Sequence, residues 1–227
     1  MNKYHKTNCG VLHLKTRNYI IMSEFDLKAN DWDKNNVNLE RAREIANQLL
    51  LTIPFRPGMK VMEFGAGTAL LSFMLQDLFS SITLVDNSVE MIRICNDKIA
   101  QAKSNHIQAI QTDLETEYFE DKFDMVYTQM ALHHVSDIGR IIHKFNHLLN
   151  DRGILAIADL YTEDGSFHDE GFTGYKGFDP EWLSKLLIQS GFENVTHKTC
   201  FIQKKVDSKG QQKEYPVFLM VASKFLE

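Results

Sequence analysis

Short apolar segments alternate with longer amphipathic segments from Phe25 onward, and this alternation limits the possible folds more than any other feature. The short segments have the length and composition of buried strands, and they cover residues 61–64, 82–85, 106–110, 123–127 and 154–158. The longer segments place apolar side chains on one helical face, and they cover residues 38–53, 70–79, 89–102, 138–149 and 180–190. Strands separated by helices pair in parallel, and the helices then cover both faces of the sheet.

The carboxyl-terminal part of the chain departs from this alternation. Two further apolar segments, residues 195–204 and 217–223, are joined by the polar stretch 207–214 without a helix between them. Such a pair is typical of a hairpin, so we expect an antiparallel strand at this end of the sheet. The sequence therefore predicts an α/β fold, with a three-layer, Rossmann-like, seven-stranded sheet that is mostly parallel, has an antiparallel end strand and carries helices on both faces.

Residues 1–22 differ from the rest of the chain. They contain Lys and Arg but no acidic residue, and they lack the unbroken apolar core of about 7–15 residues that a secretory signal requires. We expect them to form a disordered amino-terminal extension with no catalytic role. Residues 23–227 are expected to form a single domain.

The charge and the apolar content exclude several classes of protein. No segment approaches the roughly 18 apolar residues of a membrane helix, so we expect no membrane partner. The net charge of −5 argues against a nucleic-acid partner, because such binding neutralises phosphates with Lys and Arg. The cysteines lie far apart and offer no zinc framework, which favours a reducing, cytoplasmic location.

A glycine-rich loop is the strongest chemical signal. Residues 63–69, Glu-Phe-Gly-Ala-Gly-Thr-Ala, lie where a predicted strand passes into a predicted helix, and Gly65 and Gly67 let the backbone approach a ligand closely. Asp86 ends the next strand, where a carboxylate can accept hydrogen bonds from both ribose hydroxyls. Leu70 replaces the third glycine of a dinucleotide fingerprint, so we expect a nucleoside without a pyrophosphate. The alternative is a tight turn beside a solvated Asp.

Four more segments accompany the glycine loop at regular places, residues 85–88, 111–114, 123–134 and 148–153. Together with residues 63–69 they resemble the motifs of the seven-stranded, class I, S-adenosylmethionine-dependent methyltransferases of small-molecule type. The resemblance covers about residues 25–224. Glu63 in place of the commoner Asp, and Ala69 in place of the third Gly, are mild departures that keep the acid and the close packing of the helix.

The resemblance implies which residues hold S-adenosylmethionine, the expected cofactor. They are Glu63, Gly65, Ala66, Gly67, Asp86, Asn87, Met91, Asp113, Leu114, Gln129 and Met130. Glu63 and the glycine loop would hold the amino acid end and Asp86 the ribose. Asn87, Met91 and residues 113–114 would contact the adenine, and residues 129–130 would lie under the sulfonium. Met91 can equally be a helix core residue, and Asn87 can cap the helix that follows.

The acceptor is expected at the mouth of the same cleft. Trp32, His133, His134 and the segment 159–178 would surround it. That segment is rich in glycine and acids, and its aromatic side chains suit a small, partly apolar molecule: Phe167, Phe172, Tyr175 and Phe178. Its glycines suit a loop that closes over the substrate and excludes water.

His134, His168 and Asp159 are the candidate catalytic residues. Methyl transfer from a sulfonium needs mainly positioning and exclusion of water, and a general base matters only when the nucleophile carries a proton of high pKa. The histidines can therefore be bases, or they can only pack and orient. Asp159, Glu163 and His168 could together hold a divalent metal, but they have no fixed spacing, so no metal is assigned.

The expected function is methyl transfer to a small organic acceptor by in-line displacement at the sulfonium methyl group. A protein or nucleic-acid methyltransferase and a non-catalytic S-adenosylmethionine-binding protein stay open as alternatives. Leu70 counts against a nicotinamide-dependent oxidoreductase, because that fingerprint needs a small residue at this position. The sequence indicates neither the identity of the acceptor nor the oligomeric state.

Overall fold

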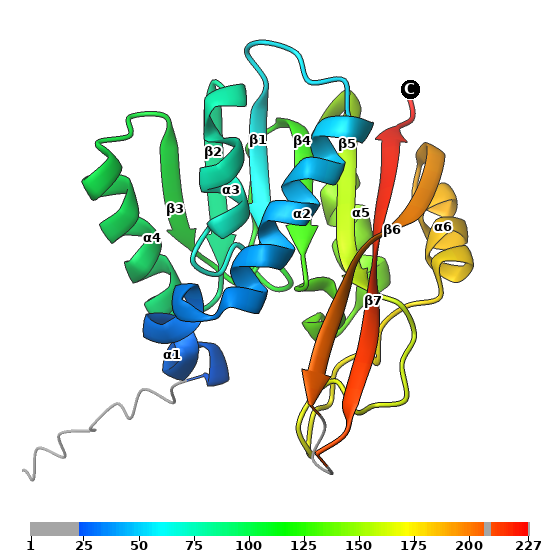
Figure 1. Ribbon diagram of the computed structural model, residues 1–227. Helices are drawn as coiled ribbons and strands as arrows, with labels where there is room; N and C mark the ends of the chain where they lie inside the picture. The colour runs from blue at the N-terminus through cyan, green and yellow to red at the C-terminus, as the bar shows by residue number, and fades with distance from the viewer. Residues whose placement is uncertain (1–22, 207–209, 227) are drawn as a thin grey trace, which may run out of the picture.

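A seven-stranded sheet forms the centre of the computed structural model, which describes residues 23–206 and 210–226 (Figure 1). The strands are β1 (Lys60–Phe64), β2 (Ser81–Asp86), β3 (Ile107–Gln111), β4 (Phe123–Gln129), β5 (Leu149–Leu160), β6 (Phe192–Val206) and β7 (Gln212–Lys224). Their order is β3-β2-β1-β4-β5-β7-β6. The expectations for residues 1–22 lie outside the described residues.

The directions of the strands confirm the predicted mixture. The strands from β1 to β5 pair in parallel, whereas β7 is antiparallel to both β5 and β6. The antiparallel strand therefore lies one place in from the edge, and β6 is the edge strand. The strand order reverses between β1 and β4, and ligands of such sheets bind at the carboxyl ends of the strands beside this point.

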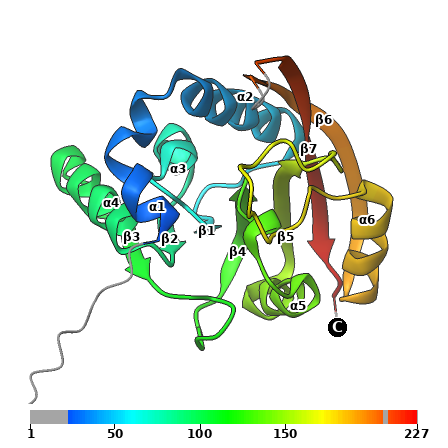
Figure 2. The ribbon, with the colours of Figure 1, turned by 90° about the horizontal axis from the view of Figure 1, so that it is seen from below.

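Helices cover both faces of the sheet, as predicted (Figure 2). One face carries α2 (Asn36–Thr52), α3 (Leu70–Leu75) and α4 (Val89–Ala102), and the other carries α5 (Ile138–Leu148) and α6 (Pro180–Gln189). Two buried clusters correspond to these faces, one with Leu49, Leu71 and Cys95 and the other with Phe145 and Leu183. Each cluster is apolar because its helices turn one apolar side toward the sheet.

Local sequence signals explain where the helices begin. Ser88 caps α4 by accepting a hydrogen bond from the N–H of Met91, and Asp179 caps α6 with Pro180 at its first position. The cap of α4 is thus Ser88, and the alternative that Asn87 caps this helix is wrong. The helix expected over 70–79 ends at Leu75 and continues as the 3₁₀ segment η2 (Gln76–Leu78).

Two short elements at the start of the described chain were not expected. They are α1 (Glu24–Lys28) and the 3₁₀ segment η1 (Ala29–Lys34), which lie beside α4 near the carboxyl ends of the strands (Figures 1 and 2). The carboxylate of Asp26 fixes α1 there, because its Oδ1 accepts hydrogen bonds from the Ser88 hydroxyl at 2.6 Å and the Glu90 N–H at 3.2 Å.

Within residues 23–206 and 210–226, no helix has the length and apolar character needed to cross a membrane.

Candidate functional site

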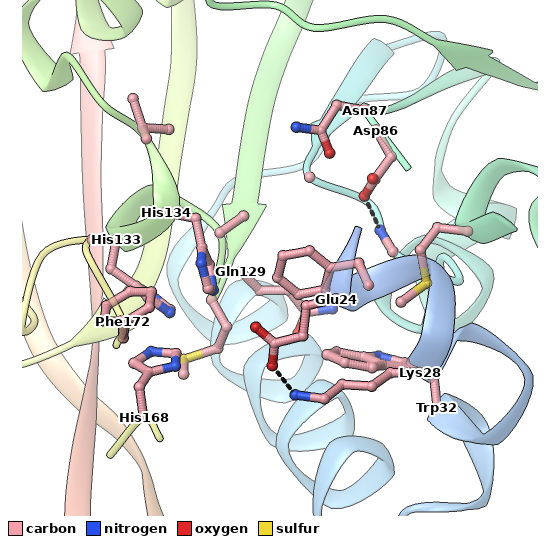
Figure 3. Close-up of a pocket in the computed structure, with 18 of the residues that line it drawn as sticks. Glu24, Lys28, Trp32, Asp86, Asn87, Gln129, His133, His134, His168 and Phe172 are labelled. Carbon is pink, nitrogen blue, oxygen red and sulfur yellow. Dashed lines mark hydrogen bonds and ion pairs between the residues drawn. The ribbon is translucent and has the colours of Figure 1, made fainter. Parts of the chain in front are cut away.

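A cavity of about 1480 Å³ opens at the carboxyl ends of the parallel strands. It is elongated, with Asp86 and Asn87 at one end and His133, His134 and His168 at the other (Figure 3). All of the predicted cofactor residues except Glu63 line it, namely Gly65, Ala66, Gly67, Asp86, Asn87, Met91, Asp113, Leu114, Gln129 and Met130. The structure therefore brings together residues that the chain separates by more than sixty positions.

The glycine loop needs both of its glycines for different reasons. Gly65 and Gly67 have positive φ values of 63° and 54°, which favour glycine. A Cβ atom at Gly65 would overlap the Cβ of Ala131, whereas one at Gly67 would meet only Trp32 Nε1, at 3.9 Å. Gly65 thus lets the loop after β1 pack against the loop after β4, and Gly67 keeps space open at the cavity.

Asp86 is held by the backbone at the end of β2. Its Oδ2 accepts a hydrogen bond from the Gly67 N–H at 2.8 Å, and its Oδ1 accepts one from the Ser88 N–H at 2.8 Å. Burial raises the pKa of this carboxyl in spite of these bonds. Each carboxylate oxygen can accept a second hydrogen bond, so the group can still receive two ligand hydroxyls.

Glu63 does not reach the cavity surface, contrary to the expectation of a contact with the cofactor. Its side chain is fully buried and accepts a hydrogen bond from the Ser72 hydroxyl, which also contacts the Tyr127 hydroxyl. Burial raises the pKa of Glu63 to about 8. Its Oε1 has no hydrogen-bond partner among the described residues, and the same is true of Gln129 Oε1.

The residues expected around an adenine gather at the end of β3 and the start of α4. Asp113 caps the turn after β3, since its carboxylate accepts hydrogen bonds from the Glu115 N–H at 3.0 Å and the Thr116 hydroxyl at 2.9 Å. Met91 is buried and also lines the cavity, so it is both a core residue and part of the wall. Asn87 is exposed at the rim.

Asp159 lies behind the histidines rather than facing an acceptor. It is fully buried at the end of β5 and accepts hydrogen bonds from His133 Nδ1 at 2.6 Å and the Leu160 N–H at 2.7 Å. His133, on the 3₁₀ segment η3 (Leu132–His134), is buried as well. The prediction that Asp159 contacts the reacting molecule is therefore wrong, because His133 separates it from the cavity. Asp159 positions His133.

Three imidazole rings meet at this end of the cavity. The ring centroids of His133 and His134 are 4.2 Å apart, and His168 lies 5.0 Å from the first and 5.2 Å from the second. His168 also stacks on Phe172 at 3.7 Å, and Phe25 of α1 lies edge-on to His134 at 4.9 Å. Burial lowers the pKa of His134 to about 3 and that of His168 to about 4, and the neighbouring imidazoles add to both effects.

The loop after β5 contributes less of the site than its composition suggested. His168, Phe167, Phe172 and Tyr175 line the cavity, but Phe178 is buried in the core. Glu163 accepts hydrogen bonds from the N–H groups of Gly165 at 2.7 Å and Phe167 at 3.1 Å, so it shapes its own loop. The alternative metal site of Asp159, Glu163 and His168 does not form, because both carboxylates are used elsewhere.

The elements α1 and η1 add cavity residues that the sequence reasoning missed. Glu24, Phe25 and Lys28 line the cavity beside Trp32, which was expected there (Figure 3). The sequence signal that could have found them is the capping box at the start of α1. There the Ser23 hydroxyl accepts from the Asp26 N–H while the Asp26 carboxylate accepts from the Ser23 N–H.

Comparison with known sequences places this arrangement among methyltransferases. Residues 55–218 match the family described as a methyltransferase domain. An uncharacterized methyltransferase of Schizosaccharomyces pombe is 29% identical over 157 residues, which are 62% of this chain and 55% of that protein. The chain thus spans about half the length of this relative.

Solved structures share the fold at low sequence identity. The protein described as the putative methyltransferase in a complex with the Haloferax volcanii Trm112 methyltransferase activator has a TM-score of 0.74 and 16% identity, and the match covers 91% of this chain and 100% of that one. A phosphoethanolamine N-methyltransferase of Haemonchus contortus, in complex with S-adenosylmethionine, has a TM-score of 0.66 and 12% identity, with 90% and 60% covered.

Proposed function

The chain belongs to the methyltransferase-domain family, and from this premise we propose that it transfers a methyl group from S-adenosylmethionine to a small organic acceptor. The family match and the seven-stranded sheet confirm the resemblance to class I, S-adenosylmethionine-dependent methyltransferases that the motifs indicated. One observation supports a more specific proposal than the family match alone. A single cavity connects the glycine loop and Asp86 to the histidine cluster.

The residues at the Asp86 end fit S-adenosylmethionine. The open space at Gly67 admits a ligand against the backbone, and Asp86 keeps acceptor capacity for two ribose hydroxyls. Glu63 Oε1 and Gln129 Oε1 are buried acceptors without a partner among residues 23–206 and 210–226, which suits the ammonium group of an amino acid. Gln129 would contact the ammonium group from the cavity wall. Glu63 would interact with this group from behind that wall.

The protein contributes positioning and exclusion of water to the reaction. S-adenosylmethionine, when bound, supplies a sulfonium methyl group that a nucleophile can displace in line. Met130, with a φ of 52°, turns the chain at the middle of the cavity, and its N–H is fixed to the Ala158 carbonyl at 2.8 Å. The rings of Phe25, Trp32 and Phe172 enclose the space beyond it, which shields a bound nucleophile from water.

The acceptor end suits a small molecule better than a polymer. It is walled by aromatic rings and imidazole rings, with Glu24 and Lys28 paired at its edge. The net charge of −5 disfavours polyanions. The Haemonchus contortus enzyme of the same fold is a phosphoethanolamine N-methyltransferase, whose acceptor is a small molecule.

Labelled methyl transfer tests the proposal. The purified chain would be incubated with methyl-labelled S-adenosylmethionine and, in parallel, with a deproteinised metabolite extract, total RNA or total protein. We expect label in the metabolite fraction and none above background in the other two. Label mainly in RNA or protein would contradict the small-molecule acceptor. Cofactor binding without transfer to any fraction would favour a non-catalytic binding protein.

A further inference from the structure

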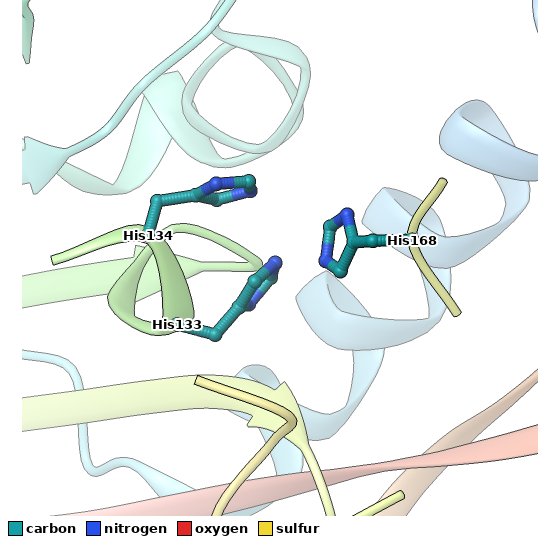
Figure 4. A group of neighbouring side chains, drawn as sticks. All are labelled: His133, His134 and His168. Carbon is teal, nitrogen blue, oxygen red and sulfur yellow. The ribbon is translucent and has the colours of Figure 1, made fainter. Parts of the chain in front are cut away.

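The histidine cluster has the composition of a metal site that the family assignment does not require. His133 and His134 come from η3 after β4, and His168 comes from the loop after β5 (Figure 4). Each offers one ring nitrogen, and these three atoms lie within 4.8 Å of one another. Figure 4 shows the rings facing a common space rather than stacking as a column.

A buried carboxylate fixes how His133 presents its ring. Its Nδ1 lies 2.6 Å from Asp159 Oδ1, and both side chains are buried. This contact leaves Nε2 as the nitrogen that can face the cavity. Ligating histidines commonly hydrogen-bond through their other nitrogen to a carboxylate, which sets the tautomer and the ring orientation.

His168 supplies an independent observation. Its Nε2 is shielded from solvent and has no hydrogen-bond partner among the described residues. A buried polar atom without a partner costs free energy unless a ligand or an ion satisfies it. Glu24 and Asp159 are the acidic groups around the cluster and favour a cation, whereas Lys205 opposes one. Two further cations offset these acids in part, since Lys28 pairs with Glu24 and the buried Arg41 interacts with Asp159.

We propose that His133, His134 and His168 bind one divalent transition metal ion such as Zn²⁺, with an open position that faces the cavity. Three histidines plus one exchangeable ligand are an established arrangement for zinc that acts on a bound molecule. If the proposed methyltransferase function holds, the open position takes the acceptor through an oxygen or sulfur atom. A metal held there would favour loss of that atom's proton to solvent. The deprotonated atom would then form its bond to the methyl carbon as the bond from that carbon to the sulfonium sulfur breaks, which leaves S-adenosylhomocysteine.

Only a small adjustment is needed to reach coordination. Zn–N bonds of about 2.0–2.1 Å place tetrahedral ligand nitrogens about 3.4 Å apart, so the rings must approach by about an ångström. His168 can make this movement because its loop contains Gly165 and Gly171, with φ values of 88° and 95°. His133 stays fixed by Asp159.

Cobalt titration tests the site without any methyl acceptor. The untagged full chain would be treated with EDTA, desalted and titrated with Co²⁺, whose tetrahedral complexes absorb strongly in the visible range. We expect saturation at one equivalent, competition by Zn²⁺, and loss of the absorption in His168→Ala. Asp159→Asn should keep the site but weaken the affinity by about 10–100-fold, as expected for a residue that orients a ligand.

The matched control is His143→Ala. His143 and His147 are exposed and one turn apart on α5, so they form a second place where a divalent ion can meet two imidazoles. Binding that His143→Ala removes and His168→Ala retains would overturn the proposal, as would absence of stoichiometric binding in a wild-type chain with a native circular dichroism spectrum. Binding of S-adenosylmethionine, measured separately by calorimetry, tests the proposed function, so the two can fail independently.

Discussion

At the scale of single residues, two of the acids expected to hold the cofactor differ in their surroundings. Asp86 faces the cavity and is held by two backbone N–H groups, whereas Glu63 is enclosed behind the wall with Ser72 and Tyr127. A carboxyl group near the end of each of two neighbouring strands thus serves as a direct acceptor in one case and as a buried, protonated group in the other.

Asp86→Ala should weaken binding of S-adenosylmethionine by about 1.5–3 kcal/mol, because hydrogen bonds to a charged acceptor are lost. Calorimetry should therefore give a dissociation constant raised roughly 10- to 150-fold. Asp121→Ala is the control, since Asp121 is exposed and outside the cavity. An unchanged constant in Asp86→Ala would show that another group holds the ribose.

Glu63 should make the ligand-free protein less stable as the pH rises. Its folded-state pKa of about 8 exceeds the ordinary value of 4.5, so folding favours the protonated form. Between about pH 4.5 and 8 the wild type should lose stability relative to Glu63→Gln, by up to about 5 kcal/mol, with no further change above pH 8. Denaturant unfolding of both proteins across this range measures the difference. A difference that is constant with pH would contradict a protonated Glu63.

At the scale of elements, α1 and η1 form one wall of the cavity while burying few side chains of their own. No residue of α1 is buried, and the element is held mainly by the contacts of Asp26 with Ser88 and Glu90. These hydrogen bonds lower the pKa of Asp26 to about 2, so the carboxylate stays ionised throughout the neutral range. An element attached in this way can open at low cost, which suits entry of ligands.

Asp26→Ala should release this wall and weaken the binding of S-adenosylmethionine, by about 1 kcal/mol, while the core remains folded. Calorimetry gives the affinity, and hydrogen exchange of residues 24–34 should show the loss of protection directly. Lys34→Ala is the matched control, because Lys34 is exposed on η1 and pairs only with the exposed Asp31 among the described residues. Equal affinity in both variants would mean that α1 does not cover the cofactor.

At the scale of the whole molecule, the alternation of strands and helices was enough to predict the sheet. Buried strands and apolar helix faces are shielded from water only when they pack against each other. The capping box marks where α1 begins, but this element has no apolar period that would show its packing against the cavity. The sequence could not predict the burial of Asp159, which depends on the rotation of one side chain at the end of β5. It also could not bring His168 next to His133, because loop conformation sets that contact.

The cofactor should stabilise the entire fold, since it binds only the folded state. At a ligand concentration about 100 times the dissociation constant, binding raises the free energy of unfolding by roughly 2.7 kcal/mol. For a domain of this size that corresponds to a rise in Tm of about 5–10 °C. Differential scanning fluorimetry with S-adenosylhomocysteine should show the rise in the wild type and a much smaller one in Asp86→Ala. No rise at any concentration would contradict the cofactor assignment.

The position of β7 has a consequence for synthesis of the protein. Although it is the last of the seven strands of the sheet in chain order, β7 lies between β5 and β6, with Phe218 opposite Asp159. The strand that carries Asp159 therefore lacks a neighbour on this side until residues near 218 have been translated and released from the exit tunnel. The nascent chain can assemble the glycine loop early, but it acquires the wall behind His133 only after these residues have emerged.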